Sequence, residues 1–215
     1  MPQKAVDAFL SSVTPFIRRP EDVISDDIAT LLALVEKWQR VQNLVSRETP
    51  GDLWQRHVLD SLQLLPLIGD ARQILDLGSG GGFPALPLAI ALKGRDTALT
   101  LIESNGRKCA FLNAAKRELG LAIHVKQSRI EAIAPESLPV PDVITARALA
   151  PLPLLLGYAA RFAGPHTRVL LHKGREYGEE LAQVDSALRT SVVVKESLTD
   201  PEAVILEWPS LFQRP

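Results

Sequence analysis

Residues 75–84, LDLGSGGGFP, decide the fold class of this chain. A short apolar run, RQILDLG (72–78), comes before the glycines and is typical of a buried strand. The stretch that follows, FPALPLAIALKG (83–94), is typical of a helix with its prolines in the first turn. Four glycines in five residues let the backbone turn sharply and bring a ligand close to the amides that open the helix. The stretch therefore predicts a ligand-binding loop between a strand and a helix; a plain tight turn is the alternative.

Strand-like and helix-like segments alternate after this loop. Further strands are expected at 98–104, 122–127, 141–147, 167–174, 191–198 and 203–209, and helices at 105–120, 151–164 and 175–190. This alternation predicts an α/β, Rossmann-like fold with a mainly parallel seven-stranded sheet, whose last two strands form an antiparallel pair. Ligands bind beyond the carboxyl ends of the strands in such sheets.

The first seventy residues have a different, helical pattern. Residues 26–45 and 51–69 carry apolar side chains at helical spacing, which in the first segment run from Ile28 to Leu44. Ser25 and Asp26 are candidate N-caps. We expect residues 1–70 to form a helical extension packed on the core and residues 71–215 to form the cofactor-binding domain.

Composition restricts the kinds of protein that remain. The chain has 215 residues, 46% of them hydrophobic, which is enough for one sizeable domain, and its net charge of −1 argues against nonspecific coating of nucleic acid. No apolar run has the ~18 residues of a membrane span, and the first twenty residues lack a signal-peptide pattern. Cys109 is the only cysteine, so an intramolecular disulfide is excluded. We expect a cytoplasmic monomer.

Three residues around the glycines distinguish between nucleotide cofactors. A dinucleotide fingerprint starting at Gly78 would need a glycine where Phe83 stands, and Pro84 lacks an amide donor for a pyrophosphate. Asp76 would repel a pyrophosphate but suits the ammonium group of a methionine moiety. The loop instead resembles the signature of S-adenosylmethionine-dependent methyltransferases. A nicotinamide-dependent oxidoreductase is the alternative, and Glu103, which can accept both ribose hydroxyls, fits either cofactor.

Several flanking stretches narrow the resemblance. KWQRVQNLVS (37–46), RHVLDSL (56–62), LDLGSGGGFPALPLA (75–89), QSRIEAI (127–133) and ITARALAPL (144–152) occur in this order. Together they resemble the bacterial glucose-inhibited division protein B family, which methylates N7 of a guanine in 16S ribosomal RNA. The resemblance implies an enzyme whose cofactor is S-adenosyl-L-methionine and whose partner is 16S ribosomal RNA, within a small ribosomal subunit or an assembly intermediate.

The resemblance also implies a set of cofactor contacts. Gly78 and Phe83 lie in the loop, Ile130 and Glu131 follow the third strand and are expected at the adenine, and Arg147 ends the fourth strand. The family often has aspartate where Glu103 stands. With the residues argued from the loop, the expected cofactor-binding set is Asp76, Gly78, Gly80, Gly82, Phe83, Glu103, Ile130, Glu131 and Arg147.

Guanine N7 carries a lone pair and no proton, so its methylation needs alignment rather than a general base. We therefore expect no acid–base residue and name Arg129 and Arg147 as positioning candidates. The Asn/Asp-Pro-Pro-aromatic motif of amine methyltransferases is absent after the fourth strand. Cys109 lies within an expected helix, where a core role is favoured over a nucleophilic one.

Local basic groups could contact RNA in spite of the neutral total charge. The candidates are Asn43, Arg56, His57, Arg107, Lys108, Arg129 and Lys173. His57 could instead pair with Asp60 on its own helix, and Asn43 could cap a helix end. The four histidines show no metal-ligand spacing, so no metal site is expected. A noncatalytic RNA-binding factor with a vestigial pocket is the third hypothesis.

Overall fold

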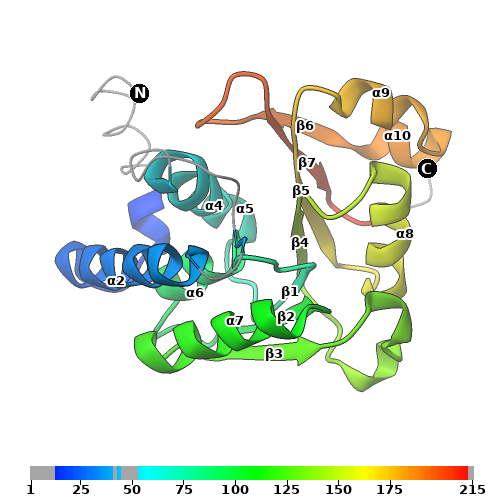
Figure 1. Cartoon of the computed structure of the whole chain (residues 1–215). Coiled ribbons are helices and arrows are strands. Elements are labelled where there is room, and N and C mark those ends of the chain that lie inside the picture. The colour runs from blue at the N-terminus through cyan, green and yellow to red at the C-terminus, as the bar shows by residue number, and fades with distance from the viewer. Residues whose placement is uncertain (1–12, 41–42, 45–52, 213–215) are drawn as a thin grey trace.

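The computed structural model describes residues 13–40, 43–44 and 53–212. A twisted seven-stranded sheet runs through its centre, with helices on both faces (Figure 1). The strands are β1 (Gln73–Leu77), β2 (Ala98–Glu103), β3 (Ile123–Gln127), β4 (Val143–Arg147), β5 (Arg168–Lys173), β6 (Val193–Glu196) and β7 (Val204–Trp208). Their order is β3-β2-β1-β4-β5-β7-β6. Neighbouring strands are parallel except where β7 pairs with β5 and β6, which confirms the predicted sheet and its antiparallel pair.

The helices divide between the two faces of the sheet. One face carries α2 (Glu21–Gln39), α4 (Asp60–Leu62), α5 (Leu65–Ile68), α6 (Ala85–Ala91) and α7 (Gly106–Leu119), and the other carries α8 (Leu152–Phe162), α9 (Tyr177–Ala182) and α10 (Ser186–Ser191) (Figure 1). Short helical turns are η1 (Thr14–Phe16), the π-helical η2 (Trp54–Leu59), η3 (Ile130–Ala132) and η4 (Pro135–Ser137). Each face has its own apolar core.

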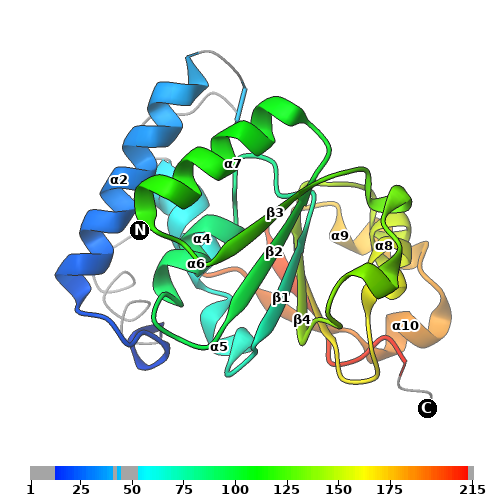
Figure 2. The ribbon, with the colours of Figure 1, turned by 90° about the horizontal axis from the view of Figure 1, so that it is seen from below.

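The helical N-terminal region packs on the sheet-covering helices. Ile28, Leu31 and Val35 of α2 are buried in the same apolar core as α6 and α7, and Trp38 meets Phe111 edge to face, with ring centroids 5.8 Å apart. Figure 2 shows α2 and α7 side by side. The boundary expected between residues 70 and 71 stays a prediction.

Two expectations about the first helix are wrong. The helix begins at Glu21, directly after Pro20, so Ser25 and Asp26 lie inside it rather than at its N-cap. It ends at Gln39, and Leu44 lies in a bend instead of continuing the helix. The side chain of Gln39 accepts a hydrogen bond from the Leu44 amide at 2.8 Å, which holds this bend against the helix end. Val41 and the start of the second expected helix lie outside the described residues.

The sheet order creates a crevice at its centre. The chain moves outward from β1 to β2 and β3 on one side, and from β4 to β5 on the other. The connections after β1 and β4 therefore diverge, which leaves space beyond the carboxyl ends of these two strands. The glycine loop occupies the end of β1.

Candidate cofactor pocket

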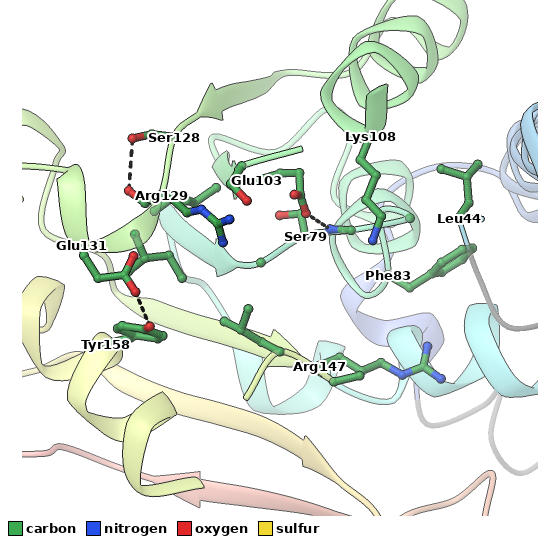
Figure 3. Close-up of a pocket in the computed structure, with 18 of the residues that line it drawn as sticks. Leu44, Ser79, Phe83, Glu103, Lys108, Ser128, Arg129, Glu131, Arg147 and Tyr158 are labelled. Atoms are coloured by element: carbon green, nitrogen blue, oxygen red, sulfur yellow. Dashed lines mark hydrogen bonds between the residues drawn. The ribbon is translucent and has the colours of Figure 1, made fainter. Parts of the chain in front are cut away.

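A cavity of about 580 Å³ opens at this crevice (Figure 3). Its walls come from the ends of β1, β2, β3 and β4 and from the bend before η2. The lining residues are Leu44, His57, Gly78, Ser79, Gly80, Gly81, Phe83, Ile102, Glu103, Ser104, Lys108, Ser128, Arg129, Ile130, Glu131, Arg147, Ala148, Leu149 and Tyr158. All five contacts implied by the resemblance are among them. The volume falls in the ~300–1,000 Å³ range of small-molecule sites.

The glycine loop shapes one wall of the cavity. Gly78, Gly80 and Gly82 have φ angles of +67°, +53° and +86°, which L side chains rarely adopt. A Cβ on Gly78 would lie 2.4 Å from Leu149, another residue of the cavity wall. Gly82 does not line the cavity, because it packs against Leu86 of α6. Gly78 and Gly80 line the cavity, whereas Gly82 does not, so the expected cofactor contact of Gly82 stays a prediction.

Glu103 joins the glycine loop to the second strand. Its carboxylate is buried at the end of β2, where Oε2 accepts a hydrogen bond from the Gly80 amide at 2.9 Å and Oε1 accepts one from the Asn105 amide at 2.7 Å. The Asn105 side chain in turn caps α7 by accepting from the amides of Arg107 and Lys108. Glu103 is thus fixed at the cavity wall, and each oxygen keeps a lone pair for a ligand hydroxyl.

Asp76 lies beneath the glycine loop and outside the cavity lining. The strand register places it opposite Thr145, whose hydroxyl donates to Asp76 Oδ1 at 2.6 Å, while Oδ2 has no hydrogen-bond partner among the described residues. Burial raises the pKa of this carboxyl to about 6, against the lowering effect of hydrogen bonds from Ser79 and Thr145. A buried acceptor without a partner is costly, which suits a site completed by a cationic group.

The raised pKa of Asp76 has a measurable consequence for stability. The folded protein holds this proton up to pH ~6, whereas the unfolded chain releases it near pH 3.8. The folded state binds more protons between these values, so the free energy of unfolding should fall by about 2 kcal/mol as the pH rises from 4 to 7. Urea unfolding of the cofactor-free protein and of Asp76→Asn across this range measures the difference. Parallel pH profiles of the two proteins would contradict the assignment.

The far end of the cavity is formed by the segment after β3. Ile130 is buried there, and Glu131 accepts a hydrogen bond from the hydroxyl of Tyr158 on α8 (Figure 3). This hydrogen bond lowers the pKa of Glu131 and raises that of Tyr158. Arg161 holds the same turn by donating to the carbonyls of Glu131 and Ile133 at 3.1 and 3.0 Å. An apolar side chain beside a fixed polar pair forms a surface suited to a planar base.

Arg147 closes the opposite end and is held on three sides. Its Nη1 lies 2.7 Å from His57 Nδ1, its Nη2 donates to the Arg56 carbonyl at 2.9 Å, and its Nε lies 3.3 Å from Asp60 Oδ2. A guanidinium only donates, so His57 Nδ1 accepts and its proton resides on Nε2. The His57 ring also packs on Phe83, with centroids 4.9 Å apart. His57 is thereby part of the cavity wall, and its partner is Arg147.

The sequence alone did not identify Asp60, Tyr158 or Leu44 as site residues. Asp60 was expected only as a partner of His57 one turn away, but its carboxylate meets Arg147 and His172, which come from the neighbouring strands β4 and β5. The π-helical turn of η2 precedes Asp60, and such widened turns often mark functional sites. The motif RHVLDSL already contained Asp60, and this was the available signal.

The candidate RNA-contact residues differ in whether they are exposed, line the cavity, or are held by an ion pair. Asn43, Arg56, Arg107 and Arg129 are exposed, and Lys108 and Arg129 line the cavity. Lys173 instead forms an ion pair with Glu180, with Nζ and Oε2 2.6 Å apart, and donates to the Ala150 carbonyl. Lys173 is therefore held by two partners of its own chain, and the whole set of RNA contacts stays a prediction.

Three further expectations concern a metal site, Cys109 and a membrane span, and they are compared with the structure of residues 13–40, 43–44 and 53–212. No group of three or more candidate ligands is arranged to hold a metal ion there. Cys109 is buried in α7 with Sγ 3.3 Å from the Glu103 carbonyl oxygen, and burial raises its thiol pKa, as suits a core residue rather than a nucleophile. None of the helices among these residues combines the length and apolarity needed to cross a membrane.

Two solved methyltransferases share this architecture. The O-methyltransferase TomG from Streptomyces achromogenes, in complex with SAM, covers 97% of this chain and 98% of its own, with a TM-score of 0.57 at 20% identity. An O-methyltransferase from Bacillus cereus, in complex with SAH, covers 94% and 96%, with a TM-score of 0.57 at 16% identity. The chain therefore has the Rossmann-like fold of class I methyltransferases, with a cavity at its strand ends, and these two neighbours were solved with SAM and SAH.

Sequence comparison then gives the family. The profile of the rRNA small subunit methyltransferase G family, GidB, matches residues 24–204. The ribosomal RNA small subunit methyltransferase G of Rhizobium meliloti (strain 1021) is 43% identical over 186 residues, which are 85% of this chain and 87% of that protein. The protein of the same name from Cereibacter sphaeroides is 43% identical over 190 residues, 87% of this chain and 91% of the relative. The chain belongs to this family, which confirms the resemblance and excludes the nicotinamide-dependent oxidoreductase.

Proposed function

We propose that the protein transfers a methyl group from S-adenosyl-L-methionine to N7 of a guanine in 16S ribosomal RNA. The observation that carries the proposal is its membership in a family of rRNA small subunit methyltransferases over residues 24–204. The small ribosomal subunit, or an intermediate of its assembly, is the proposed partner. We further infer that the protein acts as a cytoplasmic monomer.

Different residues at or beneath the cavity wall suit the adenine, the ribose and the ammonium group of the cofactor. Ile130 and Glu131 suit the adenine, because one supplies an apolar face and the other a fixed carboxylate. Glu103 suits the ribose, because both of its oxygens are held at the wall by backbone amides. Asp76 lies beneath the glycine loop and outside the cavity lining; we assign it to the ammonium group because its carboxylate has an oxygen without a hydrogen-bond partner among the described residues.

For this reaction the protein must align guanine N7 with the methyl–sulfur bond of the cofactor. When bound, the cofactor supplies an electrophilic methyl group on a sulfonium. Guanine N7 carries a lone pair and no proton, so accepting this methyl group would require no general base from the protein. The protein must hold the base in line at near-attack distance and exclude water. Arg147 contributes a rigid wall for this purpose, because three neighbours fix its guanidinium.

Exposed basic side chains near the cavity mouth give the proposed RNA surface. Arg129 lines the cavity and is exposed, so its guanidinium can stack on a base or contact phosphate beside the bound cofactor. Arg107 and Arg56 are exposed to either side, on α7 and η2. A local cluster of this kind can bind RNA although the chain has a net charge of −1.

A deletion strain tests the proposed function. Chemical cleavage at 7-methylguanosine followed by primer extension should show one stop in 16S ribosomal RNA from the parent strain and none from the deletion strain. Expression of the wild-type chain should restore the stop. Retention of the modification after deletion would refute the proposal, and so would single-turnover assays in which small subunits purified from the deletion strain accept no methyl group through the wild-type protein. The latter result would favour a noncatalytic RNA-binding factor.

A further inference from the structure

A second, smaller cavity of about 250 Å³ lies next to the cofactor pocket. Its walls come from the end of β4, the end of β5, α9, the helical segment around Asp60 and the connection between β6 and β7. The two cavities share Arg147 and Ala148. Its residues therefore extend from the end of β4, which both cavities share, to the end of β5, which the first cavity does not reach.

The junction between the two cavities is conformationally unusual. Ala148 has a φ of +50°, and it is the only non-glycine residue with a positive φ among residues 13–40, 43–44 and 53–212. A side chain in this conformation costs about 1–3 kcal/mol and persists where the surroundings impose it, often at a functional site. The strained residue follows β4 directly and lies beside the fixed guanidinium of Arg147. Arg147 and Ala148 thus form the border that the two cavities share.

Asp60 builds the floor of the second cavity and is fully engaged there. Its Oδ1 accepts from Gln63 Nε2 at 2.7 Å and Thr199 Oγ1 at 2.9 Å, and its Oδ2 lies 3.3 Å from Arg147 Nε and 3.6 Å from His172 Nε2. The register of β4 and β5 sets Arg147 opposite His172, which explains why both reach the same carboxylate. Asp60 is a positioning residue, because its own lone pairs are occupied.

Other acceptors of the second cavity remain open to a ligand. Glu180 uses Oε2 for Lys173 and the Leu152 amide, and Asp200 uses Oδ1 for the Glu202 amide, so each has a second oxygen without a hydrogen bond in the described part of the chain. His172 also borders the cavity, but it is only 8% exposed, and its Nδ1 is buried without a hydrogen-bond partner in the described part of the chain. Burial lowers the pKa of His172. Its Nε2 faces the Asp60 carbonyl at 2.9 Å, so the neutral ring has its proton on Nε2 and an acceptor at Nδ1.

We propose that the second cavity is the subsite for the acceptor base, a guanine turned out of its RNA stack. This rests on the proposed function and adds where the base lies and how it is distinguished. The Watson–Crick edge of guanine presents N–H donors at N1 and at the exocyclic amine, which match the second carboxylate oxygens of Glu180 and Asp200. Adenine has an unprotonated N1 and would leave these acceptors unpaired, which disfavours it strongly. The acidic side chains also suit the positive charge of N7-methylguanine.

Filling the second cavity tests the subsite. Ala203 lines this cavity and not the first, and its backbone bonds to Asp200 and Ser197 do not depend on its side chain. Ala203→Phe should lower single-turnover methyl transfer to purified small subunits about 100-fold, because a displaced base loses its alignment. Its calorimetric affinity for S-adenosylhomocysteine should stay within about twofold of wild type. Ala187→Phe, on the exposed surface of α10, is the matched control and should behave as wild type in both assays.

A second variant and a crosslinking experiment test the base subsite even if Ala203→Phe does not fold. Asp200→Asn, at an exposed position, should raise the KM for small subunits about tenfold and leave S-adenosylhomocysteine binding unchanged. Small subunits containing 6-thioguanosine should crosslink at residues 172–180 or 199–204. Wild-type transfer by Ala203→Phe, or crosslinks confined to residues 128–131, would overturn the subsite while leaving the proposed function intact. Absence of methyl transfer by the wild-type protein would overturn the proposed function itself.

Discussion

Gly78→Ala is expected to weaken S-adenosylhomocysteine binding about 100-fold, or about 2.7 kcal/mol. Two causes act together at this position. The φ of +67° costs a residue with a Cβ about 1–2 kcal/mol, and the added Cβ would lie 2.4 Å from Leu149. Relief of this contact pushes Leu149 or the loop into the cofactor cavity, which both residues line. Isothermal titration calorimetry measures the loss.

Gly94→Ala is the matched control for this prediction. Gly94 has a φ of +87°, but a Cβ there would meet no heavy atom within 4 Å. The control variant therefore carries the conformational cost without the steric one. It should lose about 1 kcal/mol of unfolding free energy and retain wild-type affinity. Equal affinities for the two variants would show that the contact with Leu149 does not shape the cavity.

Asp60→Ala is expected to destabilise the protein by about 3 kcal/mol and to abolish methyl transfer. The carboxylate is 10% exposed and lies between Arg147 and His172 while it accepts from Gln63 and Thr199. Removing it leaves a largely buried guanidinium without its counter-charge, which is far more costly than losing an exposed pair. Arg147 then loses one of the three contacts that fix it against the cavity. Urea unfolding and single-turnover transfer measure the two effects.

Asp70→Ala provides the comparison for the unfolding measurement. Asp70 also pairs with an arginine, with its Oδ1 3.0 Å from Arg95 Nη2, but its side chain is 98% exposed. Its removal should change the unfolding free energy by less than about 1 kcal/mol. A similar loss in both variants would mean that Asp60 is no more than a surface ion-pair partner. Retained transfer in Asp60→Ala would show that Arg147 needs no support from it.

Much of the fold could be predicted because its signals are local. The strands ending at Leu77, Glu103 and Arg147 appear in the sequence as short apolar runs, and Gly120 ends α7 in the left-handed conformation that glycine favours. The rule that ligands bind beyond the carboxyl ends of strands then placed residues from four strands around one cavity. The residues implied by family resemblance lie on the walls of that same cavity.

The errors arose where tertiary contacts override a local pattern. Apolar spacing continued to Leu44, but the helix stops at Gln39 and Leu44 turns to line the cavity. Asp76 and Gly82 belong to the signature, and although one lies beneath the loop and the other packs on α6, their expected cofactor contacts stay predictions. Sequence spacing alone cannot distinguish a residue that shapes a loop from one that faces its ligand.

The sequence by itself determined the fold class, the glycine loop and the family, because each depends on residues close together or on an ordered set of motifs. Only the tertiary structure decided the partner of Arg147 and the existence of a second cavity. Both depend on the register that sets Arg147 of β4 opposite His172 of β5, and on a helical turn that brings Asp60 to them. Contacts of this kind join residues about 90 or 110 positions apart. No local pattern encodes them, because they follow from how the strands align when the sheet forms.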